Sequence, residues 1–184
     1  MISTVATLDD LMRVDGKAEL IGGRIVPIMP TGFWPGKVAF RITQSLSAYA
    51  AAIGKGETVA DGVGYGFDQL LPSGRQSFSP DSSFYTGPVP KKHMRYIDGY
   101  PNFAVEVRSE NDYGPAADQE YEDKRADYFA VGTEIVWDVD PIAETIASYM
   151  AADPTAPTFF HRGDTADAEP ALPGWRLSVD DLFK

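Results

Sequence analysis

The sequence has no cysteine and only two histidines, His93 and His161. The lack of cysteine excludes disulfide bonds, thiolate metal sites and a cysteine nucleophile. Two histidines are too few for a multi-histidine zinc site. If the protein binds a metal, its ligands are therefore oxygen atoms, and Mg²⁺ or Mn²⁺ is the expected ion.

The sequence also lacks a long apolar run and has few basic residues. No segment approaches the roughly 20 apolar residues of a membrane-spanning helix, and residues 1–4 do not resemble the start of a signal peptide. We therefore expect a cytoplasmic protein that does not enter a membrane. The 16 Lys and Arg stand against 27 Asp and Glu, which gives a formal net charge of −11. This charge counts against non-specific polyanion binding, although acids that hold metal ions can meet phosphate through those ions.

With 43% apolar and 23% charged residues, the chain has the composition of a globular protein, and we expect one domain over residues 1–184. Helical patterns cover residues 7–12, 37–53, 118–131 and 179–183. A Gly-Gly pair predicts a hairpin over residues 18–29. Further strands are expected at 58–60, 64–67, 76–78, 81–85, 102–108, 134–140 and 145–150, with weaker pieces at 157–161 and 174–177. This order predicts an α/β or α+β domain with a mixed central β-sheet flanked by helices.

Two of the predicted strands each carry one acid in an otherwise apolar pattern. Asp81 follows a proline at the start of one strand, and Glu106 lies between Val105 and Val107 in the other. Side chains alternate along a strand, so Glu106 shares a face with Arg108. A buried carboxylate is costly without a charged or metal partner. If the two strands pair antiparallel, Asp81 and Glu106 become cross-strand neighbours and predict a metal site.

Glu19 and Lys124 are the other candidates for this site. Glu19 lies in the first strand of the predicted hairpin and is a third candidate oxygen ligand. Lys124 lies between Tyr121 and Tyr128 on a predicted helix, so its stem is expected to point inward. Two or three carboxylates could then hold a metal, while the lysine orients or activates a water molecule.

Each candidate also has a purely structural interpretation. Asp81 after a proline is typical of a turn or of the start of a strand. Glu106 could instead form a buried ion pair with Arg108 or Lys124. A salt bridge to Arg24 across the hairpin explains Glu19 equally well. Pairing on an exposed helix face is the alternative for Lys124, with Glu120 or Asp127 as its partner.

Two other charged groups are better explained as solvated surface. Asp138 and Asp140 alternate with apolar residues and indicate a solvated strand end. Lys91, Lys92, His93 and Arg95 form a local basic group, which favours a solvated loop over a binding patch.

The order of these segments resembles the Uma (Uma-two) family of restriction-endonuclease-like proteins, within the PD-(D/E)XK nucleases. The matching stretches are residues 19–26, 79–84, 105–109, 123–128 and 131–141. The resemblance covers nearly the whole chain from residue 8. It implies a restriction-endonuclease-like core whose mixed sheet carries Asp81 and Glu106, with an added N-terminal hairpin and added C-terminal strands. It further implies that the lysine of the E-x-K element has moved to the helix, as Lys124.

The chain departs from the family pattern at two places. Residues 35–37 read Pro-Gly-Lys, where the family often has a histidine. Arg108 stands where the family often has an apolar residue. It could stabilise negative charge in the transition state in place of the missing lysine. It could equally pair with Glu106 and occupy the metal ligand's place, which would favour a degenerate site.

The resulting prediction is a divalent-metal-dependent endonuclease that hydrolyses DNA phosphodiester bonds. The predicted metal ligands are Asp81, Glu106, Glu19 and the carbonyl of Val107, with Mg²⁺ or Mn²⁺ as the ion. The predicted catalytic residues are Asp81, Glu106, Lys124 and Arg108. DNA is the expected partner, and a homodimer is left open. One alternative is a catalytically degenerate nuclease-fold protein that acts as a binding or assembly module. A weaker one is a hydrolase for a small phosphate ester.

Overall fold

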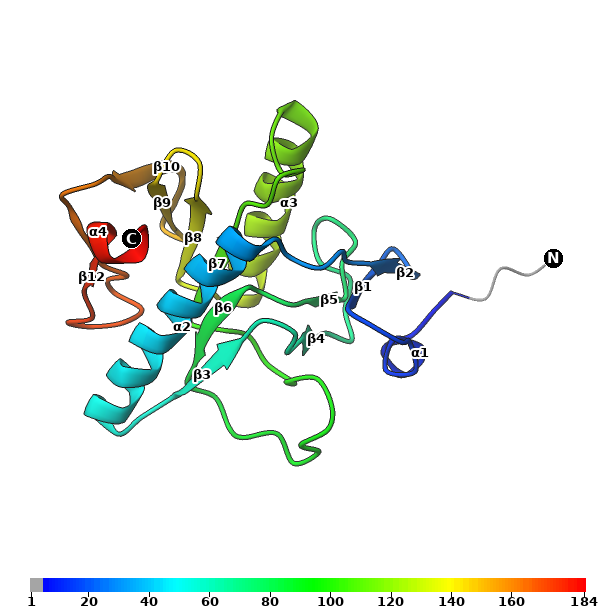
Figure 1. The fold of residues 1–184 in the computed structure, drawn as a ribbon. Coiled ribbons are helices and arrows are strands. Elements are labelled where there is room, and N and C mark those ends of the chain that lie inside the picture. Colours follow the sequence, from blue (N-terminus) through cyan, green and yellow to red (C-terminus); the bar gives the residue numbers. More distant parts are fainter. Residues whose placement is uncertain (1–4) are drawn as a thin grey trace.

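A six-stranded mixed sheet forms the centre of the computed structural model, which describes residues 5–184 (Figure 1). Residues 1–4, on which the expected lack of a signal peptide rests, lie outside this described part. The strand order is β10-β9-β8-β7-β6-β3. Strands β7 and β8 run parallel, and the other four neighbouring pairs run antiparallel. The strands are β3 (Glu57–Ala60), β6 (Ser82–Tyr85), β7 (Phe103–Val107), β8 (Ile135–Asp140), β9 (Thr145–Met150) and β10 (Asp153–Phe160).

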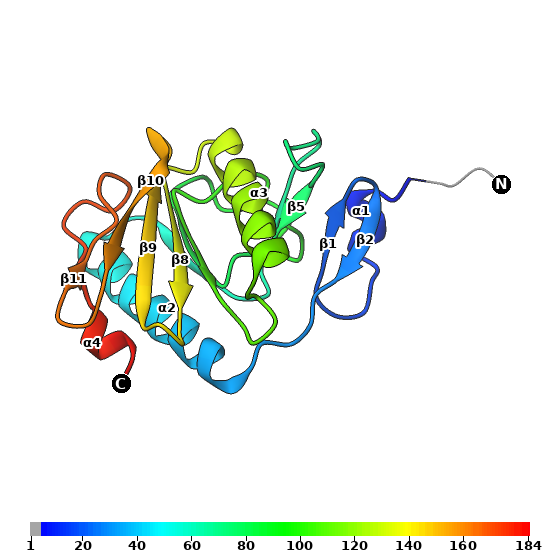
Figure 2. The ribbon, with the colours of Figure 1, turned by 90° about the horizontal axis from the view of Figure 1, so that it is seen from above.

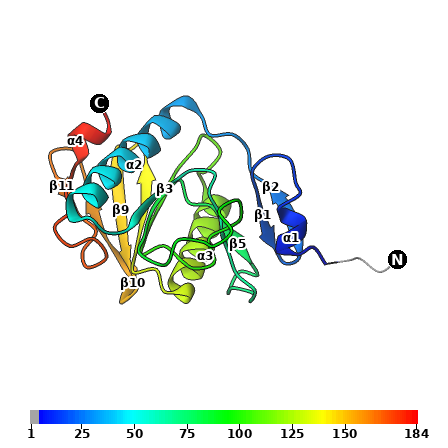
Figure 3. The same ribbon diagram turned by 90° about the horizontal axis from the view of Figure 1, so that it is seen from below.

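In the described part of the chain, three small sheets and four helices accompany the central sheet. Three two-stranded pairs are formed by β1 (Ala18–Ile21) with β2 (Arg24–Pro27), β4 (Tyr65–Gly66) with β5 (Ser77–Phe78), and β11 (Thr165–Ala166) with β12 (Leu177–Ser178). The helices are α1 (Leu8–Leu11), α2 (Phe33–Ile53), α3 (Pro115–Val131) and α4 (Val179–Leu182). The β1–β2 hairpin and α1 lie together at one end of the molecule, opposite α4 (Figure 3). The predicted mixed sheet with an N-terminal hairpin and C-terminal additions is confirmed.

Helices α2 and α3 cover opposite faces of the sheet (Figure 2). The alternation of β7 explains this arrangement, because Phe103 and Val105 join the apolar cluster under α2 while Ala104 joins the cluster that includes Tyr128 of α3. Helix α2 packs through a stripe of buried residues, Val38, Ile42 and Leu46, at four-residue steps. It ends at Gly54, whose φ of 64° suits a residue without Cβ.

Helix α3 has no comparable apolar stripe. Its buried residues are Asp127 and Tyr128, so α3 is attached to the sheet by charged side chains as well as by the apolar packing around the Tyr128 ring. It begins at Pro115 and α2 begins at Phe33, three and four residues before the helical patterns of the sequence. None of the helices within residues 5–184 is long and apolar enough to cross a membrane.

Candidate active site

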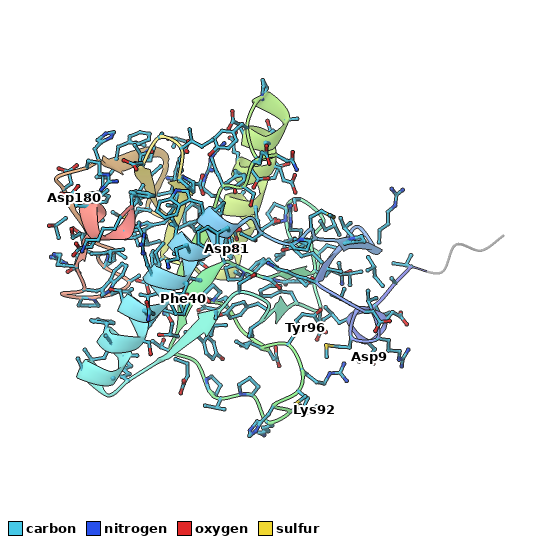
Figure 4. The ribbon with its side chains drawn as sticks, in the orientation of Figure 1. Asp9, Phe40, Asp81, Lys92, Tyr96 and Asp180 are labelled. Carbon is cyan, nitrogen blue, oxygen red and sulfur yellow. The ribbon has the colours of Figure 1, made fainter. Side chains whose placement is uncertain are left out.

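The pairing of β6 with β7 brings the two predicted acids together. The strands are antiparallel, with Ser82 opposite Val105, which brings Asp81, just before β6, close enough to Glu106 in β7 for the two charges to interact. Asp81 N–H donates to the Val105 carbonyl at 3.0 Å, and Asp81 Oδ2 accepts the N–H of Val107 at 2.7 Å. The predicted cross-strand relation is confirmed, and Asp81 lies in the middle of the molecule (Figure 4).

The carbonyl of Val107 accepts no backbone hydrogen bond from the described residues that flank the strands. The pairing of β6 with β7 ends at Ser82 opposite Val105, and Pro80, just before Asp81, has no N–H to donate. Val107 faces β6 rather than β8, because its neighbour Arg108 donates its N–H to Val139 on the β8 side. The ladder between β6 and β7 therefore stops at this point. Val107 lines a cavity of about 460 Å³ together with Asp81 and Glu106.

Lys124 and Tyr128 reach Glu106 from α3. They are four residues apart and so share a helix face. Lys124 Nζ lies 2.9 Å from Glu106 Oε1, and the Tyr128 hydroxyl donates to the same oxygen at 2.5 Å. Lys124 Nζ also lies 3.4 Å from Oε1 of Glu19. The inward orientation of Lys124 is confirmed, and the alternative of an exposed pair on the helix surface is wrong.

Glu19 is held by three donors rather than by the salt bridge across the hairpin. The register of β1 and β2 puts Val26 opposite it and Arg24 opposite Ile21. Its Oε1 accepts the N–H of Ser79 at 3.1 Å and also meets Lys124. Its Oε2 lies 3.5 Å from Nε of Arg75. The Arg24 alternative is therefore wrong, and both oxygens of Glu19 are engaged.

Arg75 is a buried arginine that the sequence did not indicate. It is 4% exposed and joins the first hairpin to α3. Besides Glu19, its guanidinium meets Asp127 at 3.5 Å and Glu120 at 3.3 Å. Asp127 is fully buried and also binds Ser73. Glu120 and Asp127, the two acids that the sequence offered as alternative partners of Lys124, thus both contact Arg75.

Arg108 is bound at the start of α3 and not by Glu106. Its Nη1 lies 2.8 Å from Asp118 and 2.8 Å from the carbonyl of Asp112. The guanidinium also stacks on Tyr121, 4.6 Å from the ring centroid. Of the two buried ion pairs that were the alternatives for Glu106, the one with Arg108, which would favour a degenerate site, does not form, and the one with Lys124 does.

Asp138 is buried, so the prediction of a solvated position is wrong. It lies on β8 directly beside Glu106 in the parallel register, and it is 6% exposed. Arg125 of α3 binds its Oδ2, whereas its Oδ1 has no hydrogen-bond partner among the described residues. The exposed basic group is a separate feature, because the loop that carries Lys92 projects from the molecule away from Asp81 (Figure 4).

The acids of this site carry unequal proton affinities. Burial, followed by the charge of Glu106, raises the pKa of Asp81 to about 7. Burial likewise raises the pKa of Asp138 to about 7, against the lowering effect of Arg125. Burial also acts on Glu19, but Lys124, the Ser79 N–H and Arg75 outweigh it and lower the pKa of Glu19. Burial is thus compensated at Glu19 but not at Asp81.

The charge of Lys124 is firmly fixed. Burial alone would lower the pKa of this lysine, but the charges of Glu106 and Glu19 outweigh burial and raise it above its ordinary value. Between α3 and the sheet, five acidic side chains meet three cations, and two of the acids, Asp81 and Asp138, have raised pKa values. The carboxylates belong to Glu19, Asp81, Glu106, Asp127 and Asp138, and the cations to Arg75, Lys124 and Arg125.

The donor set of the cavity fits Mg²⁺ or Mn²⁺. Mg²⁺ in proteins is usually bound by one or two carboxylates and keeps several water molecules. Asp81 and Glu106 each use one oxygen for the contacts described above, which leaves Oδ1 and Oε2 with the Val107 carbonyl. Within residues 5–184, no group of three or more His, Cys, Asp or Glu side chains is arranged to hold a metal. The fit therefore depends on two carboxylates, one carbonyl and water.

Comparison with known proteins identifies relatives of the chain. The profile of the Uma2 family, described as "Putative restriction endonuclease", matches residues 5–180. No curated protein matches the chain significantly. Among solved structures, the fold is similar to that of a "putative nuclease belonging to DUF820" from Anabaena variabilis ATCC 29413. The two are 19% identical with a TM-score of 0.70, over 96% of this chain and 97% of the other. This likeness confirms the predicted nuclease-like fold.

Proposed function

The chain belongs to the Uma2 family, and from this premise we propose that it is a divalent-metal-dependent endonuclease that hydrolyses DNA phosphodiester bonds. The observation that carries the proposal is the paired acids Asp81 and Glu106, each with one uncommitted oxygen beside the free carbonyl of Val107. We assign the metal to these three groups. Glu19 is left out of the ligand set, because both of its oxygens are engaged.

A bound Mg²⁺ or Mn²⁺ would polarise the scissile phosphate and lower the pKa of the attacking water. It would also place a positive charge beside Asp81. Burial and the charge of Glu106 disfavour the ionised form of this carboxyl group, and the metal would favour it. A phosphate would then meet the ion rather than the acids, which makes a DNA substrate compatible with the net charge of −11.

Lys124 acts as a charged donor in this proposal and not as a general base. Its raised pKa keeps the ammonium group protonated at neutral pH, so it cannot accept a proton from water. From its place against Glu106, 2.9 Å away, it can donate to the attacking water or to a phosphate oxygen and neutralise developing negative charge. Arg108, which is bound to Asp118, contributes by holding the start of α3.

Metal binding and DNA cleavage test the proposal together. Isothermal titration calorimetry with MnCl₂ on the wild type should show binding that Asp81→Ala and Glu106→Gln abolish. Asp153→Asn is the matched control, because this acid lies exposed on edge strand β10. Supercoiled plasmid and single-stranded circular DNA should be nicked only with metal present, and only by the wild type and the control.

The outcomes separate the proposal from its alternatives. No metal binding by the wild type, or binding that survives Asp81→Ala, would refute it. Binding without cleavage of either DNA would favour the degenerate module instead. Hydrolysis of a small phosphodiester such as bis-(p-nitrophenyl) phosphate, with both DNA substrates left intact, would favour the hydrolase for small phosphate esters.

A further inference from the structure

Tyr128 has a buried hydroxyl group to which the proposed chemistry gives no role. The side chain is fully buried in α3, and its ring packs against Phe78 at a centroid distance of 4.2 Å. A phenylalanine would satisfy this packing equally well. A buried hydroxyl is retained at a cost unless it is hydrogen-bonded, and here it donates to a carboxylate, at 2.5 Å from Glu106 Oε1.

Both donors of α3 converge on the same oxygen of Glu106. Tyr128 and Lys124 approach Oε1 at 2.5 and 2.9 Å. Two donors at one oxygen fix the rotation of the carboxylate about its last bond. The two donors leave the other oxygen of Glu106, Oε2, without a hydrogen-bond partner within residues 5–184. Glu106 lines the same cavity as Asp81 and Val107.

We propose that Tyr128 is a positioning residue that holds Glu106 as a monodentate metal ligand through Oε2. The inference rests on the proposed function, because it concerns the same metal. Hydrogen-bond partners of metal ligands orient those ligands, and their loss typically costs about 10- to 100-fold in metal affinity. A tyrosine with a merely structural role would affect folding but not the metal.

Tyr65 provides a matched control for Tyr128. It is also fully buried, belongs to the same apolar cluster, and its ring lies near the same Phe78. Its hydroxyl is bound to Ser83 Oγ at 3.0 Å rather than to a carboxylate of the site. Tyr65→Phe and Tyr128→Phe therefore remove the same atom from equally buried positions. The two variants differ in whether the lost hydrogen bond reaches Glu106.

The experiment compares Mn²⁺ affinity by isothermal titration calorimetry and metal-free stability by thermal unfolding, for the wild type and both variants. We expect Tyr128→Phe to weaken Mn²⁺ binding by about 10-fold or more, and Tyr65→Phe to leave it unchanged. Excess Mn²⁺ should restore DNA nicking by Tyr128→Phe but not by Asp81→Ala. If Tyr128→Phe is too unstable for calorimetry, the recovery of its nicking at rising Mn²⁺ concentration gives the same answer.

Two results would overturn the inference while the proposed function stands. These are wild-type affinity in Tyr128→Phe, and equal weakening in both variants, which would assign the effect to packing. A wild type that binds no Mn²⁺ overturns the proposed function and the inference with it, and it is recognised before either variant is measured.

Discussion

Replacing Asp81 by asparagine should stabilise the metal-free protein at pH 8 and do so much less at pH 5. Asparagine has nearly the same shape, and its side-chain oxygen can still accept the N–H of Val107, which lies 2.7 Å from Asp81 Oδ2. The substitution therefore removes a charge while the hydrogen bond and the packing stay. The difference in stability between the wild type and the variant is then the cost of ionising a buried carboxyl group beside Glu106, which only the wild type bears.

The magnitude follows from the pKa of Asp81, which burial and the charge of Glu106 raise from 3.8 to about 7. A raised carboxyl pKa means that the folded state holds the proton more tightly, so stability falls as pH rises from 3.8 to 7. At pH 8 the carboxyl group is ionised in both states and the full cost is present. The two pKa values differ by about 3 units, and at about 1.4 kcal/mol per unit the cost is about 4 kcal/mol. At pH 5 the folded carboxyl is mostly protonated, and the same relation gives a cost of about 2 kcal/mol.

Urea unfolding in EDTA at both pH values measures this difference, with Asp153→Asn as the exposed control. Asp81→Asn should exceed the wild type in stability at pH 8, and its advantage should shrink by about 2–3 kcal/mol at pH 5. Added Mn²⁺ should stabilise the wild type and not the variant. An advantage that is equal at both pH values, or a less stable variant at pH 8, would refute the reasoning.

Three further substitutions test the buried charges and one tight turn by urea unfolding in EDTA. Lys124→Met should destabilise the protein by about 3–5 kcal/mol, because buried Glu106 loses its cation and Glu19 loses one of its two; a change below about 1 kcal/mol would contradict this. Arg75→Met should cost as much for the same reason, whereas the exposed Arg162→Met should cost under about 1 kcal/mol. Gly132→Ala should cost about 1–3 kcal/mol, since its φ is 111° and an added Cβ would lie 2.8 Å from a tyrosine ring. Gly62→Ala, with positive φ but open space, isolates the backbone part of that cost, and equal losses would exclude the contact with the ring.

The pairing of Asp81 with Glu106 could be predicted because it depends on local patterns. Alternation along residues 102–108 sets the face of Glu106, and antiparallel pairing then determines its neighbour. The inward orientation of Lys124 also follows from local spacing, since Tyr128 lies one helical turn beyond it. These relations need only the period of each element and the order of two strands.

The buried surroundings of the site could not be predicted in the same way. Asp138 alternates with apolar residues as an exposed strand end would, but β8 is a central strand that runs parallel to β7 with α3 above it. Such strands are buried on both faces, and every residue from Ile135 to Val139 is buried. The run of apolar neighbours was the available signal. The sequence around Arg75 carries no such signal. Arg75 lies in the connection between β4 and β5, and its partners come from β1 and α3, which are distant in the sequence.

The same contacts hold α3 to the sheet and shape the candidate site. An amphipathic helix is normally attached by an apolar stripe, but α3 is attached through Lys124, Arg125, Asp127 and Tyr128. Buried ion pairs are a poor source of stability, because desolvation offsets much of their attraction. An apolar stripe would hold the helix more cheaply, so packing alone does not explain these charges. They are explained if the interface must place a lysine and a tyrosine against one oxygen of Glu106 and leave its other oxygen for a divalent ion.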